Sequence, residues 1–368
     1  SPSRGLGDVY KRQRFKIMKK VLFSLVMVCV AIGSAKAQDV LLATLQKGET
    51  TQYFYGSDAF KEAMEAAENG NTITLGAGTY NAIDITKAVS IYGNGYEMRA
   101  DTTSQKEGNM AFPTRIAGDF AIALEAVNDA PAKGLYIEGI YSADRVRITK
   151  HLSTASFVKC RFQNLTFWDA ENKNMTTSDG VSIIHCRVAS WLEPGDSQNM
   201  VVSNSIIHGL GSNTTTSSIL LQNNVIIMPT ANLIGTFRNN IIYYVGNYNG
   251  FESSSSNYAS LKPECNAYNN LYGYTSAFNG VIVQSSNYRI DMSAPFTSYS
   301  DESKYSLPDE WLTQYIGTDG TQVGIHGGSS PFNTILTIPT IVSKNIAPKT
   351  ENGKLKVSIT VKVGDNTL

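Results

Sequence analysis

Apolar and polar positions alternate in short runs through the middle of the chain, and one six-residue pattern recurs there. Six segments align without gaps on a central Cys or Asn: FVKCRF, IIHCRV, VVSNSI, LLQNNV, TFRNNI and NAYNNL. An apolar residue stands two positions before and two positions after each centre, and the adjacent residues are mostly polar. A period of two is typical of a strand with one buried face. We therefore predict short strands whose central Cys or Asn points inward.

These centres recur roughly every 20 residues, which predicts a solenoid. Glycine takes the same place in YIEGIY and, less well, in SIYGNG. The intervals are 46, 21, 26, 18, 19, 16 and 30 residues, and we interpret the 46 as two turns with one unrecognised centre. Stacked Asn amides at the strand spacing of ~4.8 Å can hydrogen-bond to one another inside a core. The predicted inward ladder comprises Gly93, Gly139, Cys160, Cys186, Asn204, Asn223, Asn239 and Asn269.

Two solenoid classes use an inward Asn or Cys column, and the spacing distinguishes them. A leucine-rich repeat would show an LxxLxL pattern, which is missing here, whereas the apolar positions are mixed Val, Ile and Phe. A parallel β-helix tolerates unequal turns because insertions loop out of the coil. The expected fold class is therefore all-β, a right-handed parallel β-helix.

An amphipathic helix is predicted before the first coil, in SDAFKEAMEAAENG at residues 57–70. Ser57 or Asp58 can cap its N-terminus, and Asn69-Gly70 ends it. Its apolar face is predicted to comprise Phe60, Met64 and Ala67.

The segment DAFKEAMEAAENGNTITLGAGTYNAIDITKAVSIYGNGYE resembles the N-terminal stretch of pectin-lyase-like β-helix proteins. In that family a helix caps the open end and is followed by a G-x-Y turn and an I-x-G-x-G rung. DGTQVGIHGGSSPF, Asp319 to Phe332, resembles the closing segment of exported bacterial relatives. The resemblance covers roughly residues 55–335 and implies a β-helix with an N-terminal capping α-helix. It implies no single activity, because the superfold hosts lyases, hydrolases, epimerases, adhesins and non-enzymes.

The chain is expected to comprise four parts. Residues 1–17 are interpreted as a non-native or adapter-derived leader, and residues 18–37 as a signal peptide with charged, apolar and small-residue regions. Residues 38–335 form the β-helix domain, and residues 336–368 a linker and the start of a truncated C-terminal β-sandwich-like domain. The signal predicts a secreted protein, or one on the outer surface of a Gram-negative bacterium. Its apolar stretch of about 12 residues is too short to span a bilayer.

Charge and cysteine content narrow the classes of partner. Lys and Arg number 31, as do Asp and Glu, so overall charge argues against a nucleic-acid partner. Three cysteines follow the signal peptide, without metal-site spacing and without the even number of a disulfide framework. We expect a monomer with no metal or cofactor. Calcium would be a cofactor only if the protein is a lyase.

Candidate catalytic residues are sparse, and none is assigned. Pectate-lyase chemistry needs carboxylates that hold calcium, and hydrolysis needs paired carboxylates. No Asp or Glu occurs from Ser197 to Phe251, and RVRIT, Arg145 to Thr149, only superficially matches the basic motif of the hydrolases. His208, followed by Gly209 and Gly211, is interpreted as a turn residue rather than a general base. The sequence therefore favours a non-enzyme.

Basic side chains on two successive rungs form the candidate binding patch. We expect Lys159, Arg161, His185 and Arg187 to point outward onto one sheet face. Such a patch can hold the carboxylates or sulfates of an acidic polysaccharide. The alternative is a solvated face balanced by Asp169, Glu171 and Glu193. Two functions stay open: a non-catalytic protein that binds polysaccharide or cell-surface glycan, and a polysaccharide lyase or glycoside hydrolase of the pectin-lyase superfold acting on acidic polysaccharide.

Overall fold

A computed structural model describes most of the chain after the predicted signal peptide. The leader and signal peptide assigned to residues 1–37 lie outside the described residues. Those described are 41–96, 113–127, 133–169, 173–214, 216–229, 232–243, 261–273, 277–290, 305–334, 336, 340–351 and 354–362.

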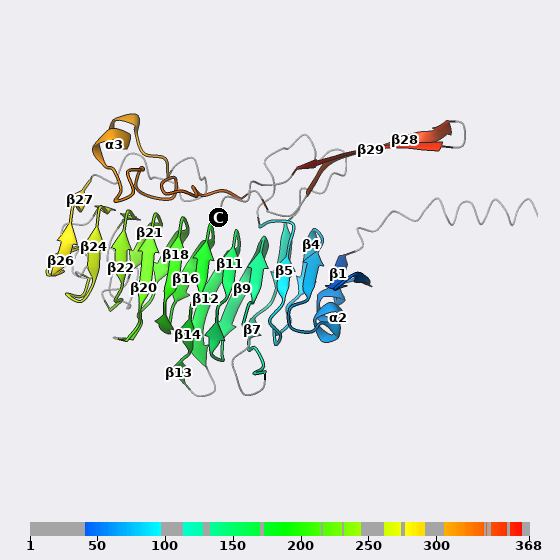
Figure 1. Cartoon of the computed structure of the whole chain (residues 1–368), viewed down its shortest axis with the longest axis horizontal. Coiled ribbons are helices and arrows are strands. Elements are labelled where there is room, and N and C mark those ends of the chain that lie inside the picture. The colour runs from blue at the N-terminus through cyan, green and yellow to red at the C-terminus, as the bar shows by residue number, and fades with distance from the viewer. Residues whose placement is uncertain are drawn as a thin grey trace, which may run out of the picture. The chain divides into compact units, whose positions relative to one another are not determined.

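The chain coils into a parallel β-helix, which confirms the predicted fold class (Figure 1). Each coil contributes one strand to a first sheet and one to a second, and both are 12-stranded. The first sheet, in spatial order, comprises β2 (Thr50–Tyr55), β1 (Leu42–Lys47), β3 (Thr72–Leu75), β5 (Ser90–Tyr92), β8 (Tyr136–Glu138), β11 (Ser156–Val158), β15 (Ser182–Ile184), β18 (Met200–Ser203), β20 (Ile219–Gln222), β22 (Thr236–Arg238), β24 (Asn266–Tyr268) and β26 (Val283–Ser285). From β3 onward neighbours are parallel and in register.

The second sheet follows the first, coil by coil. Its main path comprises β4 (Gly78–Asn81), β6 (Thr114–Ala117), β9 (Ile140–Ile148), β12 (Arg161–Asp169), β16 (Arg187–Glu193), β19 (Ile206–Leu210), β21 (Val225–Pro229), β23 (Ile241–Ile242), β25 (Leu271–Tyr272) and β27 (Tyr288–Arg289). Two further strands pair beside it, β7 (Phe120–Ile122) with β9 and β13 (Asn174–Met175) with β12. A third, three-stranded sheet comprises β10 (Leu152–Ser153), β14 (Thr177–Asp179) and β17 (Asp196–Gln198).

The N-terminal end of the coil is capped as predicted by a helix, α2 (Ala59–Ala66), shorter than the expected 57–70. Phe60, Met64 and Ala67 are buried, because the amphipathic face packs on the hairpin β1–β2 and on β4. Asp58 is the N-cap residue, but its side chain makes no capping hydrogen bond. The C-terminal end of the helix is capped by the side chain of Lys87.

Lys87 Nζ donates hydrogen bonds to three carbonyls of the last helical turn, those of Met64, Glu65 and Ala67, at 2.7–2.9 Å. The last carbonyls of a helix have no N–H donor four residues later and carry its partial negative charge. Replacing Lys87 with Met should therefore lower the free energy of unfolding by about 1–2 kcal/mol. Chemical denaturation measures it. Lys61→Met is the control, because Lys61 makes only an exposed pair with Glu65 at 3.9 Å and should change the same free energy little. Equal losses in the two variants would contradict the capping role.

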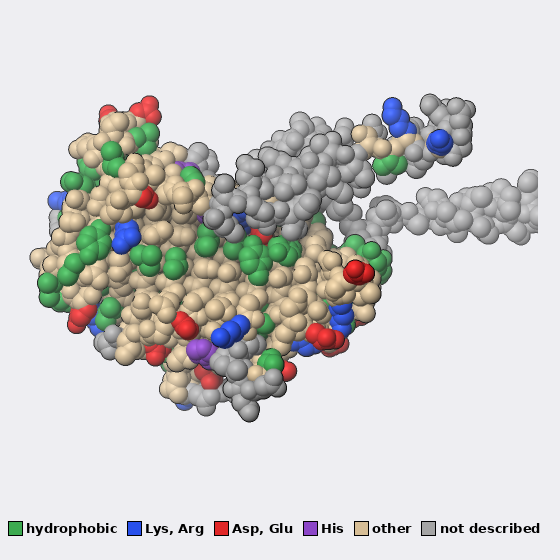
Figure 2. Space-filling view, in the orientation of Figure 1, with side chains coloured by type: hydrophobic (Ala, Val, Ile, Leu, Met, Phe, Trp, Pro, Cys, Tyr) green, Lys and Arg blue, Asp and Glu red, His purple; other side chains and the backbone are tan. Residues whose placement is uncertain are grey.

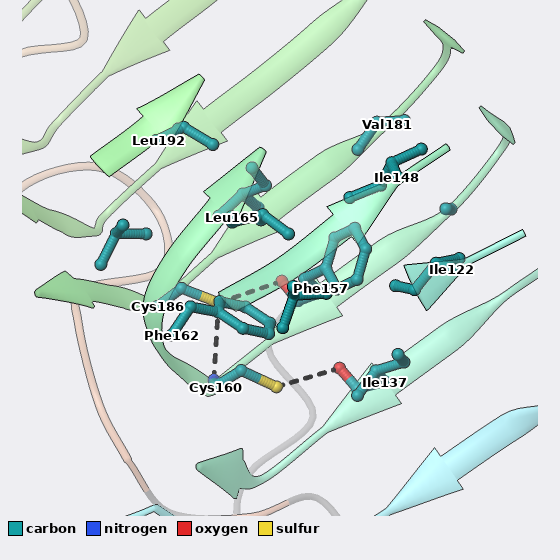
Figure 3. Packing of buried hydrophobic residues seen from close by; sticks show 14 of the residues in the cluster. Ile122, Ile137, Ile148, Phe157, Cys160, Phe162, Leu165, Val181, Cys186 and Leu192 are labelled. Atoms are coloured by element: carbon teal, nitrogen blue, oxygen red, sulfur yellow. Dashed lines mark hydrogen bonds between the residues drawn. The ribbon is translucent and has the colours of Figure 1, made fainter. Parts of the chain in front are cut away.

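The interior of the coil is apolar and closely packed (Figure 3). Phe157 and Phe162 meet edge to face with ring centroids 5.6 Å apart. Cys160 and Cys186 stack on adjacent coils, and the Cys160 backbone N–H donates to Cys186 Sγ at 3.5 Å. Burial raises the pKa of the Cys160 thiol, and the neighbouring Cys186 raises it further. Both thiols are free and act as small buried side chains.

A polar ladder does run through the interior, but one residue later than predicted in the Asn coils. Asn224 N and Nδ2 both donate to Asn240 Oδ1 at 3.0 Å, and Asn240 repeats the pair with Asn270. The column comprises Cys160, Cys186, Ser205, Asn224, Asn240, Asn270 and Asn287. Asn204, Asn223, Asn239 and Asn269 were therefore wrongly placed in it.

Those four asparagines occupy the corner between the first and second sheets, where the chain needs a left-handed residue. The corner column comprises Gly139, Lys159, His185, Asn204, Asn223, Asn239, Asn269 and Ser286, with φ from 44° to 72°. Asn and Gly tolerate this conformation best. Gly139 thus belongs to the corner rather than to the inward ladder. Gly93 stands in register with Gly139 at the same corner, although its φ is not in the left-handed region. Its N–H donates to the Glu138 carbonyl at 2.8 Å, because β5 pairs directly with β8. The interval of 46 residues is consequently one coil with an insertion, not two turns.

A C-terminal segment, residues 305–334, returns along these corners, and we call it the strap (Figure 1). It begins near α3 (Asp309–Gln314). Asn269 Nδ2 donates to the Ile316 carbonyl, Asn204 Nδ2 to those of Ile325 and Gly327, and His185 Nε2 lies 2.9 Å from the Ser330 carbonyl. The strap therefore runs antiparallel to the order of the coils.

The strap covers an apolar stripe on the outer face of the second sheet. The stripe consists of Ile206, Val225, Ile241 and Leu271, which pair in register. It forms a second hydrophobic cluster with strap residues, of which Val323 and Ile325 are 2% and 0% exposed. The sequence pattern had placed these four residues inward; the inward residues are their neighbours, such as Ile207 and Ile226.

The chain beyond the strap forms a two-stranded antiparallel hairpin of β28 (Thr340–Glu351) and β29 (Lys354–Lys362). The alternation in KLKVSITVKV is thus a strand, and its assignment to a β-sandwich remains a prediction. No helix in the described part of the chain is long and apolar enough to cross a membrane. One face of the coils carries a band of hydrophobic side chains and only scattered charges (Figure 2).

Candidate functional site

A groove of about 680 Å³ lies on the outer face of the second sheet. Strands β9, β12 and β16 form its floor. The groove lies over the C-terminal halves of these strands, away from the corner column that precedes them. The lining includes Arg145, Arg147, Trp168, Met175, Trp191 and Glu193.

The floor is a block of outward side chains from three strands in register. One row comprises Arg145, Asn164 and Trp191. The next comprises Arg147, Thr166 and Glu193. The alternate residues Val146, Leu165 and Leu192 are buried in the core. Because these rows share one face, the strands present two guanidinium groups, an indole and a carboxylate together.

Two glycines of β19 and its end give the larger side chains their room. A Cβ on Gly209 would lie 2.6 Å from Trp191 Cε3, and one on Gly211 would lie 2.9 Å from Glu193 Cγ. Neither φ is in the left-handed region, so space rather than backbone conformation requires glycine here. The indole and the carboxylate therefore lie over the neighbouring strand.

Hydrogen bonds and ion pairs fix the floor. Arg147 Nη1 lies 3.1 Å from Asp119 Oδ2, and the Arg145 backbone N–H donates to Asp119 Oδ1 at 3.0 Å. Asn164 Oδ1 accepts from the Trp191 backbone N–H at 3.3 Å. Asp119 thus offsets part of the positive charge and holds β9 in place.

One wall of the groove is an extension of β12 that pairs with β13. Trp168 pairs with Met175 there, and each is 38% exposed. The wall thus places an indole and a thioether side by side at the surface. Trp168 and Trp191 thus provide two aromatic surfaces for the same groove.

The predicted basic patch is divided by the structure. Arg161 and Arg187 do pair in register on the outer face of the second sheet. Arg161 lies over the Tyr141 ring at 4.8 Å, and Arg115 lies over the same ring at 5.6 Å. This part of the patch is a stack of arginines and tyrosine next to the groove on the same strands.

Lys159 and His185, in contrast, do not share that face, which corrects the prediction. They occupy the left-handed corner and are 3% and 1% exposed. Lys159 Nζ lies 3.9 Å from Glu138 Oε1, and burial lowers the pKa of Lys159 while the Glu138 carboxylate opposes this. Burial likewise lowers the pKa of His185, against the effect of the Ser330 carbonyl. His185 therefore belongs to the contact between corner and strap, while Lys159 forms a buried pair with Glu138.

The other residues singled out in the sequence have structural positions. His208 lies inside β19, so the expected turn is wrong, and burial lowers its pKa. Asp196 Oδ1 accepts from Thr214 and Thr216 hydroxyls at 2.6 and 3.0 Å. Within the residues that the structure describes, no group of three or more His, Cys, Asp and Glu side chains is arranged to hold a metal ion.

The groove itself was missed by sequence reasoning because β-bulges hide its register. From Phe162 to Asn164 the register advances two residues, while from Val188 to Trp191 it advances three. An ungapped alignment therefore does not bring Trp191 beside Asn164. The available signal was the pair Arg145 and Arg147, which alternate on one strand face.

Comparisons of the chain with protein-family models, with curated proteins and with solved structures give no match.

Proposed function

We propose that this protein is an exported, non-catalytic glycan-binding β-helix of the pectin-lyase-like type, whose groove holds an acidic polysaccharide. The observation that carries the proposal is the joint placement of two tryptophans and two arginines in one groove of about 680 Å³. The export signal and the family resemblance enter from the sequence alone.

Sugar rings have apolar faces that stack on indoles, while their hydroxyl and carboxylate groups take hydrogen bonds at the rim. Trp168 and Trp191 supply such surfaces from the wall and the floor. Arg145 and Arg147 supply charged donors that suit a carboxylate or sulfate. Arg161 and Arg187 extend the positive charge along the same strands. A chain of acidic sugars fits this arrangement better than a neutral one.

The alternative, a lyase or hydrolase acting on acidic polysaccharide, is favoured by one feature, the presence of Glu193 in the groove. Hydrolysis by the usual route uses two carboxyl groups about 5–9.5 Å apart across the scissile bond. Among the described lining residues Glu193 is the single carboxylate, and nearby Asp119 is engaged by Arg147. Binding without cleavage therefore remains the better-supported function.

Replacing Trp168 or Trp191 with Ala should weaken binding of an acidic polysaccharide by about five- to tenfold, since one stacked aromatic contributes on the order of 1–1.5 kcal/mol. Arg145→Ala combined with Arg147→Ala should weaken it further and reduce its dependence on salt. Polygalacturonate, alginate and a sulfated glycan, each titrated by calorimetry, provide the measurement.

Two control variants test whether the position of the Trp191 indole and the location of the arginines in the groove matter for binding. Gly209→Ala leaves Trp191 in the chain but forces its indole to move, so it should reproduce part of the Trp191→Ala loss. Arg289→Ala removes an exposed arginine of β27, outside the groove, and should leave the affinity unchanged. Release of unsaturated or reducing-end products, abolished by Glu193→Gln, would overturn the non-catalytic function. Equal affinity in all variants would show that the polysaccharide does not bind in this groove.

A further inference from the structure

A second cavity, of about 390 Å³, lies between the strap and the edge of the first sheet. One wall comes from the last residues of three strands, Ser203, Gln222 and Arg238, which pair in register. The opposite wall comes from the strap, at Thr318 to Asp319 and at Gly328 to Ser330. The cavity therefore joins two segments that are far apart in the sequence, and it does not share residues with the groove.

The strap side of this cavity is built around a fixed carboxylate. Asp319 Oδ1 accepts from the Thr321 backbone N–H at 3.0 Å and from its hydroxyl at 2.8 Å. Asn239 Oδ1 accepts from the Thr318 N–H at 2.9 Å, which ties this turn to the corner. Asp319 is exposed to solvent on the strap, so its second oxygen can take hydrogen bonds from a ligand.

The sheet side contains donors that the protein does not use. Arg238 Nε is buried, and no group in the described part of the chain accepts its hydrogen bond. The same is true of Nδ2 of Asn223, which is 1% exposed and packs against Gly327 and Gly328 beside the cavity. A buried donor without a partner is costly, so each of these two groups calls for a partner such as water, an ion or a bound molecule.

From these contacts we propose that the cavity binds a single neutral sugar residue. The lining combines a guanidinium from the sheet side and a carboxylate from the strap side with side-chain amides and hydroxyls. This set matches a ligand whose hydroxyls both donate and accept. An anion fits less well because Asp319 stands in the lining, and a metal ion lacks further carboxylates there. A volume of about 390 Å³ is of the size that small-molecule sites have.

The bound sugar would contact strap and coils together, so it would also hold the strap in place. Ligand binding to a site that exists only when the strap is docked stabilises the docked state. This inference rests on other residues than the proposed function, and the failure of one leaves the other standing.

Saturation-transfer difference NMR and thermal shift on the intact chain test the cavity, with glucose, galactose, mannose, rhamnose and their methyl glycosides as probes. At least one should bind and raise the melting temperature. Arg238→Ala should weaken that binding by about tenfold or more, the loss expected when a charged donor is removed. Asp319→Asn, on the exposed turn, should weaken it several-fold without affecting folding, and serves if the arginine variant is unstable.

Matched controls identify the site. Arg289→Ala should leave sugar binding unchanged, and so should Trp168→Ala, which alters only the groove. The proposal is overturned if no probe gives saturation transfer, if phosphate or acetate binds through Arg238 while the sugars do not, or if binding survives both Arg238→Ala and Asp319→Asn. Loss of binding in Trp168→Ala alone would assign the sugar to the groove instead.

Discussion

Replacing Asn224 with Ala is expected to lower the free energy of unfolding by about 3–5 kcal/mol, because several buried backbone groups lose their partners at once. Asn224 Oδ1 accepts from the Ser205 N–H at 3.0 Å, and Nδ2 donates to the Val202 carbonyl at 2.8 Å. Its Nδ2 also donates to Asn240 Oδ1. Each of these groups is inside the coil, where water cannot replace the side chain.

The neighbouring residue provides a control that differs by one position. Asn223 has φ 53° at the corner and directs its amide toward the strap. Asn223→Gly keeps the left-handed conformation without strain, so it should change the free energy of unfolding by no more than about 1 kcal/mol. Urea denaturation of both variants, followed by circular dichroism, makes the comparison. A larger loss for Asn223→Gly than for Asn224→Ala would place the ladder where the sequence pattern alone had placed it.

The fold could be predicted from the sequence because its signal is repeated. Each coil independently shows a buried strand followed by a small or amide residue, and the helix cap is marked by its own amphipathic face. The position of the ladder could not be predicted as well. Adjacent residues such as Asn223 and Asn224 have the same side chain but different roles. Asn223 adopts the left-handed backbone conformation of the corner, whereas Asn224 makes the hydrogen bonds of the ladder.

The cysteine coils explain how the ladder was shifted. In them Lys159 and His185 occupy the left-handed corner, a place where Asn and Gly are favoured. An alignment on the first Asn of the later coils pairs Cys186 with Asn204, whereas the structure pairs Cys186 with Ser205, the next residue. Lys159 tolerates the corner as one member of a buried pair with Glu138, a long-range contact that a local pattern does not contain.

The groove and the place where the strap docks on the second sheet were beyond prediction for a related reason. An apolar residue covered by a distant segment looks the same in sequence as one that faces the core. Ile206 and Val225 are buried on the outside of the coil by the strap, residues 305–334, which is far away in the sequence. The residues in register with them on the two preceding coils are Arg161 and Arg187, which lie outside that cluster. This row of outward side chains changes from arginine to aliphatic residues at Ile206, where the apolar cluster shared with the strap begins.

That covered stripe makes a second large effect testable. Ile325 is 0% exposed in the cluster that joins strap and sheet, and its carbonyl accepts a hydrogen bond from Asn204 Nδ2 at 3.0 Å. Replacing Ile325 with Asp should lower the stability of the docked strap by at least about 3–5 kcal/mol, because packing is lost and a carboxylate is placed in an apolar site. Since the core inside the coil is a separate cluster, the coils should stay folded while the strap is released.

Hydrogen exchange followed by mass spectrometry distinguishes release of the strap from unfolding of the coils. In Ile325→Asp, peptides covering residues 316–332 should lose protection, including the Gly324 N–H that donates to the Asn239 carbonyl at 2.7 Å, while peptides from β11 and β15 keep theirs. The exposed stripe should also bind an apolar dye. Ser329→Asp adds the same charge at an exposed strap position and should leave exchange unchanged. Full protection of the strap in Ile325→Asp would show that its polar contacts to the corner column suffice without the apolar cluster, and simultaneous loss in strap and coils would show that the two clusters unfold as one unit.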